Sequence, residues 1–97
     1  MALDFKIYIH RNSDNLHLKL AGGFDASSAY ELYNILDLYH GEVRKIFIHT
    51  CDLSSVHSFG KRIFKMKCAA FKELLPNIVF TGQAATELAL PGTKHIS

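Results

Sequence analysis

The chain has 97 residues, of which 48% are hydrophobic and 21% are charged, so we expect residues 1–97 to form a single globular domain with no room for a second core. The 11 basic and 9 acidic residues nearly balance, which argues against nucleic acid as a partner because its binders usually carry a concentrated basic surface. No apolar run approaches the roughly 20 residues of a membrane span, and the charged N-terminus does not resemble a signal peptide.

An antiparallel hairpin is predicted at the start of the chain. Residues 5–10 and 16–20 each alternate between apolar and polar side chains, which is typical of half-buried strands, and the polar segment 11–15 predicts the turn. On the outward face, His10 and His17 are expected to approach one another. Two histidines without a nearby carboxylate or thiol are a weak metal signal, so no metal site is predicted.

The first helix is predicted to begin at Ser28, because Glu31 three residues later completes a capping-box signature. Gly41 is expected to end it after about residue 40. Its buried stripe recurs at helical spacing and consists of Leu32, Ile35, Leu36 and Tyr39.

A central strand and a long second helix are predicted next. Residues 43–50 contain three consecutive apolar side chains, which is typical of a strand buried on both faces, and residues 51–56 are expected to form a polar loop. Ser58 is expected to cap the helix, which would run to a break at Pro76. The helix is predicted to have an apolar face with Phe59, Ile63, Met66, Ala70 and Leu74, and a basic face with Lys61, Arg62, Lys65 and Lys72.

The C-terminal part predicts a short buried strand at residues 77–81 and a short helix at residues 83–90, followed by a loose tail at residues 93–97. The fold class is therefore α/β, with one mixed sheet of about four strands. The first strand pairs antiparallel and the others parallel, since strand–helix–strand crossovers impose parallel pairing. The helices are expected to cover mainly one face of the sheet, because there are too few to cover both.

No catalytic set is visible in the sequence. Cys51 and Cys68 form no CxxC pair and have no spaced histidine partner, and no glycine-rich phosphate loop follows a strand. We therefore expect the protein not to be an enzyme and to need no cofactor. Two free thiols in a chain that can build its own core suit a reducing cytoplasm.

Two segments resemble the STAS family, the domain family of anti-sigma factor antagonists. AGGFDASSAYEL resembles the family's G-E-L-D segment, with Asp25 at its aspartate. In VRKIFIHTCDLSSVHSFGKRIF, residues 52–54 match a D-L-S turn, and Ser58 and Gly60 match the serine and glycine of a D-S-S-G helix start. The resemblance spans about residues 5–90 and implies a STAS-like fold.

The departures from the family pattern fall mainly in the same motifs. His57 stands where the family has an acidic residue, Phe59 replaces the second serine, and Gly23 replaces the glutamate of G-E-L-D. The sequence also ends after the short third helix, where many family members continue with another strand and a long helix. We expect this shortening to leave a face of the sheet open for a partner or a second copy, in a homodimer.

The resemblance implies a regulatory protein-binding module of the bacterial partner-switching type. In that family the motif serine is phosphorylated by a partner kinase, often an anti-sigma factor, so Ser58 is the candidate phosphorylation site. The implied partner-binding surface consists of Asp25, His57, Ser58, Phe59, Gly60, Lys61 and Arg62. Two alternatives stay open: a structural subunit of a signalling scaffold or a lipid-transporting ABC complex, and a sensor of a nucleotide or anion.

Each of these residues also has a purely structural interpretation. Ser58 would be an N-cap worth about 1 kcal/mol, Asp25 a second capping residue, and His57 an exposed loop histidine. Phe59 is expected to lie in the core, although an exposed Phe59 would be an aromatic anchor for a partner. The basic face of the second helix would then be a solvated surface.

Overall fold

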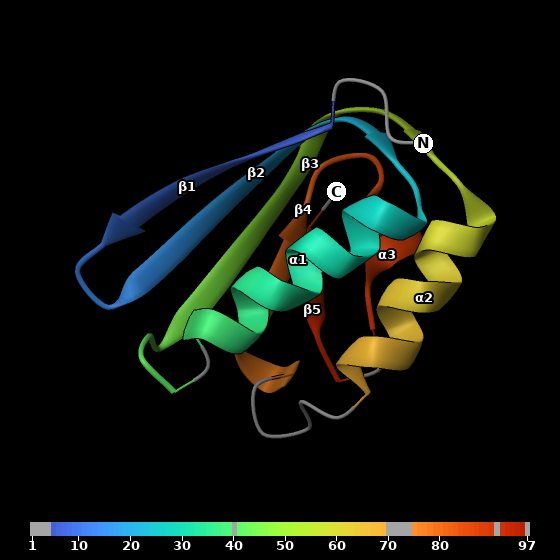
Figure 1. Ribbon diagram of the computed structural model, residues 1–97. Coiled ribbons are helices and arrows are strands. Elements are labelled where there is room, and N and C mark those ends of the chain that lie inside the picture. The colour runs from blue at the N-terminus through green and yellow to red at the C-terminus, as the bar shows by residue number, and fades with distance from the viewer. Residues whose placement is uncertain (1–4, 40, 70–74, 91, 97) are drawn as a thin grey trace.

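The computed structural model describes residues 5–39, 41–69, 75–90 and 92–96. Its strands form one five-stranded sheet in the order β1-β2-β3-β4-β5, in which β1 pairs antiparallel with β2 and all other neighbours pair parallel (Figure 1). The predicted mixed sheet is confirmed, with one strand more than expected. The elements are β1 Lys6–Asn12, β2 Asn15–Phe24, α1 Ala26–Tyr39, β3 Lys45–Val56, α2 Ser58–Cys68, a 3-10 turn Leu75–Asn77, β4 Ile78–Thr81, α3 Ala85–Leu88 and β5 Lys94–Ile96.

The additional strand is β5, which lies in the tail that the sequence predicts to be loose. It pairs with β4, and the Gly82 N–H donates a hydrogen bond to the Ile96 carbonyl at 3.1 Å. A tight turn before it is held by the Thr93 hydroxyl, which donates to the Leu90 carbonyl at 2.6 Å. All three β5 residues are exposed. No hydrophobic alternation therefore signals this strand, and backbone pairing with a free sheet edge decides it.

The predicted loop at residues 51–56 is wrong, because β3 continues through this segment to Val56. The end of β2 pairs with this extension of β3. Ala21 lies opposite Asp52 and Phe24 opposite Val56, and the register shifts at two points between β2 and β3. β4 reaches only Thr81, which lies opposite His49. The extension therefore has one strand neighbour instead of two, and its mostly exposed side chains are as polar as those of a loop.

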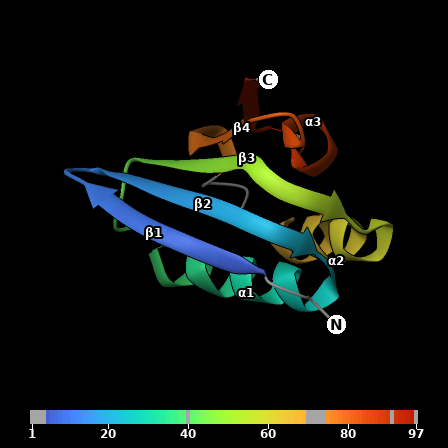
Figure 2. The ribbon, with the colours of Figure 1, turned by 90° about the horizontal axis from the view of Figure 1, so that it is seen from above.

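The core lies between the helices and one face of the sheet. In Figures 1 and 2, α1 and α2 lie side by side against this face, which confirms that the helices cover mainly one face. Phe47 of β3 points to the other face and is only half-buried, so the expected burial of β3 on both faces is wrong. The fully buried side chains include Leu16, Leu18, Leu20, Phe24, Leu32, Leu36, Ile46, Ile48, Phe64, Ile78, Phe80 and Leu88.

The buried face of α2 differs from the prediction. Gly60, Phe64 and Cys68 are buried, whereas Phe59 and Met66 are 60% and 65% exposed. Of the predicted apolar face, Ile63 packs half-buried against the core, so the prediction is wrong for Phe59 and Met66. The buried face is rotated toward Gly60 and Phe64, because Gly60 is in close contact with the backbone of Asp25. Three further residues of the predicted helix lie outside the described residues: Ala70, Lys72 and Leu74.

Phe64 is the centre of the packing between α2 and the sheet. Its ring meets Phe24 edge-on at a centroid distance of 6.0 Å and Phe80 at 6.2 Å. One turn later, Cys68 is buried and free, and burial raises the pKa of its thiol to about 12. Cys68 therefore acts as a small apolar core residue. Within the described ranges, no helix is long and apolar enough to cross a membrane.

Candidate functional site

The two longer helices begin next to each other. β2 and β3 are parallel neighbours that end in register, with Phe24 opposite Val56, and each strand leads directly into a helix (Figure 1). The His57 N–H donates to the Phe24 carbonyl at 2.8 Å and ties the two junctions together. This topology brings Asp25 and His57, which are far apart in the sequence, to the same edge of the sheet.

Asp25 caps α1. Its carboxylate accepts hydrogen bonds from the Ser28 N–H at 3.1 Å and the Ser27 hydroxyl at 2.8 Å, while its own N–H donates to the Ser28 hydroxyl at 3.1 Å. The helix thus begins at Ala26, and Ser28 is a buried residue of its first turn instead of the predicted cap. The signal in the sequence is a reciprocal Asp-x-x-Ser box one turn earlier than the Ser28–Glu31 pair.

These hydrogen bonds favour the charged form of Asp25. Burial would raise the pKa of the carboxyl, but the bonds from the Ser28 N–H and from the Ser27 and Ser28 hydroxyls outweigh it and lower the pKa to about 2. The resulting stability is present above the ordinary value of 3.8 and is lost as the pH falls toward 2.

Replacing Asp25 with alanine is expected to lower the free energy of unfolding by about 1 kcal/mol at pH 7. The difference from wild type should shrink as the pH falls from about 4 toward 2, because protonation removes the cap from the wild type too. Urea denaturation of both proteins near pH 4 and near pH 2 measures this difference in the free energy of unfolding. Asp25→Asn, which keeps an acceptor oxygen at every pH, is the control. A difference between wild type and Asp25→Ala that stays constant with pH would contradict an ionised cap.

Gly60 sets the distance between the two helix starts. A Cβ atom on Gly60 would lie 2.5 Å from the carbonyl carbon of Asp25 and 2.6 Å from its oxygen. Both atoms belong to the backbone and cannot rotate away, so α2 can pack here only with glycine at this position. The glycine that the STAS resemblance singles out therefore has a steric reason in this chain.

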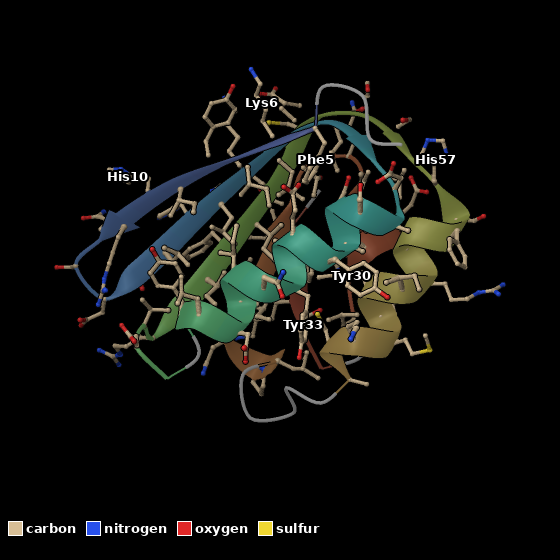
Figure 3. All side chains as sticks on the ribbon, viewed as in Figure 1. Phe5, Lys6, His10, Tyr30, Tyr33 and His57 are labelled. Atoms are coloured by element: carbon tan, nitrogen blue, oxygen red, sulfur yellow. The ribbon has the colours of Figure 1, made fainter. Side chains whose placement is uncertain are left out.

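Ser58 is not the N-cap of α2, because the cap is His57, with extended backbone angles of φ −79° and ψ 138°. The bond from the His57 N–H to Phe24 keeps this residue extended, so the helix starts one residue later and Ser58 is its first residue. The side chain of His57 makes no capping hydrogen bond to α2. Ser58 and His57 are both exposed, and His57 projects at the rim of the fold in Figure 3.

Phe59 is 60% exposed, so its expected place in the core is wrong. It borders a shallow depression of about 470 Å³ that is also lined by Asp25, Ala26, Ser27 and His57. The depression therefore combines a carboxylate, an imidazole and a phenyl ring at the start of both helices.

No protein-family model and no curated protein matches the sequence. A Moorella thermoacetica RsbS variant with a serine replaced by glutamate matches the structure with a TM-score of 0.64 over 93% of this chain and 85% of that chain, at 19% identity. The anti-sigma factor antagonist SpoIIAA, in its unphosphorylated form, matches with a TM-score of 0.62 over 96% of this chain and 86% of that chain, at 12% identity.

The chain has the STAS fold. An uncharacterized DUF3478-family protein with a SpoIIAA-like fold from Shewanella loihica matches in the same way, with a TM-score of 0.62, 16% identity, and coverage of 96% of this chain and 84% of that chain. The STAS resemblance of the sequence is thus confirmed for the fold.

Within this STAS fold, the predicted partner-binding residues divide into an accessible and a structural group. His57, Ser58, Phe59 and Arg62 are exposed, and Lys61 is half-buried on the first turn of α2. Gly60 is buried against Asp25, whose carboxylate is engaged in capping α1. We call the five accessible residues, His57, Ser58, Phe59, Lys61 and Arg62, the α2 start surface.

Proposed function

We propose that this chain is a non-catalytic regulatory module that binds a protein partner through the α2 start surface. The observation that carries the proposal is the exposure of Phe59 beside Ser58 at the start of α2, where the N-cap residue His57 makes no side-chain cap hydrogen bond. An exposed aromatic ring next to a depression is the kind of anchor that dominates protein interfaces. The STAS fold, shared with RsbS and with the anti-sigma factor antagonist SpoIIAA, supports a regulatory role.

Ser58 is proposed as the phosphorylation site that controls this binding. The first amides of a helix have no partner inside the helix, and the helix dipole is positive there, so both favour a phosphate. Lys61 and Arg62 follow Ser58 by three and four residues, which places them on the same side of α2. A phosphate would add about −1.5 to −2 charges to the surface and would be held in place by these groups.

We propose a cytoplasmic partner of the anti-sigma factor kinase type, because such a kinase both binds and modifies the family's motif serine. His57 replaces the acidic residue of the motif and removes one negative charge beside Ser58. The phosphorylated state would therefore meet less like-charge repulsion from its immediate neighbour than in the usual motif.

The test measures capture of partners from the native cell extract by four tagged variants. Phe59→Ala is expected to weaken capture at least about tenfold, as for a central aromatic anchor. Ser58→Asp is expected to change which partner is captured, whereas Ser58→Ala should keep the wild-type partner. Met66→Ala is the matched control, since Met66 is a similarly exposed apolar residue further along α2.

Mass spectrometry of the protein from its native cell should find phosphate on Ser58. If Ser58→Ala, Ser58→Asp and Phe59→Ala all retain the wild-type partner as well as Met66→Ala does, the α2 start surface is not the docking site. If the partner is retained and Ser58 carries no phosphate under any growth condition, the binding role stands without the switch.

A further inference from the structure

The face of the sheet that points away from the helices is open. Residues on this face are identified by the strand register, since directly paired residues point to the same side. In Figure 2 no helix passes in front of β1, β2 or β3, and in Figure 3 Lys6 and His10 project from β1 on the side away from α1. The open face consists of Lys6, Tyr8, His10, Asn12, Asn15, His17, Lys19, Ala21, Lys45, Phe47, His49, Asp52, Thr81, Lys94 and Ile96. Val79 of β4 points to the same side but is buried.

The charged side chains of this face are mostly positive. Four exposed lysines lie on it, and its one carboxylate among the described strand residues is Asp52, whose Oδ2 is 3.1 Å from the Lys19 ammonium. The near balance of charges over the whole chain therefore hides an uneven distribution. The lysines lie on four different strands: Lys6, Lys19, Lys45 and Lys94.

Aromatic and imidazole rings alternate with these lysines. Tyr8 lies between Lys6 and His10 on β1 and is 54% exposed. On β3, Phe47 follows Lys45 at the next position of the same face, and its ring stacks on His17 at 4.8 Å between centroids and an angle of 9°. The open face thus combines accessible rings with cations along several strands.

A hydrogen-bonded chain holds the central rings in place. His17 Nδ1 lies 3.0 Å from His49 Nε2 with the rings coplanar to 2°, and His49 Nδ1 lies 2.7 Å from the Thr81 hydroxyl. Burial, with His17 and Lys19 nearby, lowers the pKa of His49 and favours its neutral form. His49 is therefore held as a neutral ring between the lysines, and its hydrogen bonds to His17 and Thr81 fix its position.

We infer that the open face binds single-stranded nucleic acid. Lysines spread over the sheet can pair with successive phosphates, and unpaired bases can stack on the rings between them, which is how sheet platforms hold single strands. The alternation of lysines and rings favours a nucleic acid over an acidic polypeptide, because carboxylates would pair with the lysines but would not stack on the rings. A base-paired duplex keeps its bases stacked inside the helix, so its bases cannot stack on the protein's rings either.

Fluorescence anisotropy with a labelled oligouridylate of about 10 nucleotides tests the inference at low salt. Wild type is expected to bind, and Tyr8→Ala and Lys45→Gln are each expected to weaken binding about tenfold or more. Tyr30→Ala on α1 and Lys65→Gln on α2 are the matched controls, since both residues are exposed and lie outside the open face. These controls should bind as wild type does.

Three outcomes would overturn the inference. The first is no binding at micromolar protein and about 50 mM salt, conditions that favour phosphate contacts. The second is an equal loss in Lys45→Gln and Lys65→Gln, which would mean unspecific attraction by total charge. The third is binding of a polyglutamate peptide or a duplex of matched length as tightly as the oligouridylate, which would assign the face to an acidic protein or to phosphates alone. Thermal melts of every variant check that binding losses do not reflect unfolding.

Discussion

Gly60→Ala is expected to destabilise the protein by about 3 kcal/mol or more and to displace the start of α2. The added Cβ would lie 2.5 Å from a backbone atom of Asp25, so the helix or the β2–α1 junction must move. The gain in helix propensity on replacing glycine offsets only about 1 kcal/mol. Because Ser58 and Phe59 precede Gly60, the same variant should also impair binding at the α2 start surface. Urea denaturation measures the loss of stability.

Gly41→Ala separates this steric effect from the general cost of replacing a glycine. Gly41 has φ +81°, and nothing in the described residues lies within 4 Å of a Cβ placed there. Its replacement should cost about 1 kcal/mol through backbone strain alone. A Gly60→Ala variant that is no less stable than Gly41→Ala would show that α2 is free to shift at this contact.

Phe64→Ala is expected to lower the free energy of unfolding by about 3–5 kcal/mol, which is a large part of the stability of a domain this size. The ring is fully buried between Phe24 and Phe80, and its removal would leave a cavity that these two large rings cannot close without losing their own contacts. Denaturant titration monitored by circular dichroism would measure the change.

Phe59→Ala provides the comparison on the same helix and with the same residue type. Because Phe59 is 60% exposed, its removal should change stability by no more than about 0.5 kcal/mol. Similar losses for Phe59→Ala and Phe64→Ala would mean that the buried face of α2 is assigned wrongly.

The periodicity of the sequence suffices for most of the fold. Alternating residues in 5–10 and 16–20 predict the hairpin, and Leu32 and Leu36 at helical spacing predict the buried side of α1. Each pattern repeats over enough residues to distinguish a strand from a helix. The parallel crossovers then follow from element order. Short or polar elements escape this reasoning: β5 has no buried residue, and the end of β3 has the composition of a loop although it pairs with β2.

By itself the sequence determined the order of the elements, the α/β class with a mixed sheet, and the Asp25 and Ser58–Gly60 motifs that resemble STAS proteins. Tertiary structure alone decided which residues of those motifs are accessible. The contact of Gly60 with the Asp25 backbone turns Phe64 inward and leaves Phe59 outside, and apolar spacing along one helix cannot encode a steric contact with another element. The pairing of the strands likewise places lysines that are far apart in the chain on one face of the sheet. Counting the charges along the sequence cannot predict this arrangement.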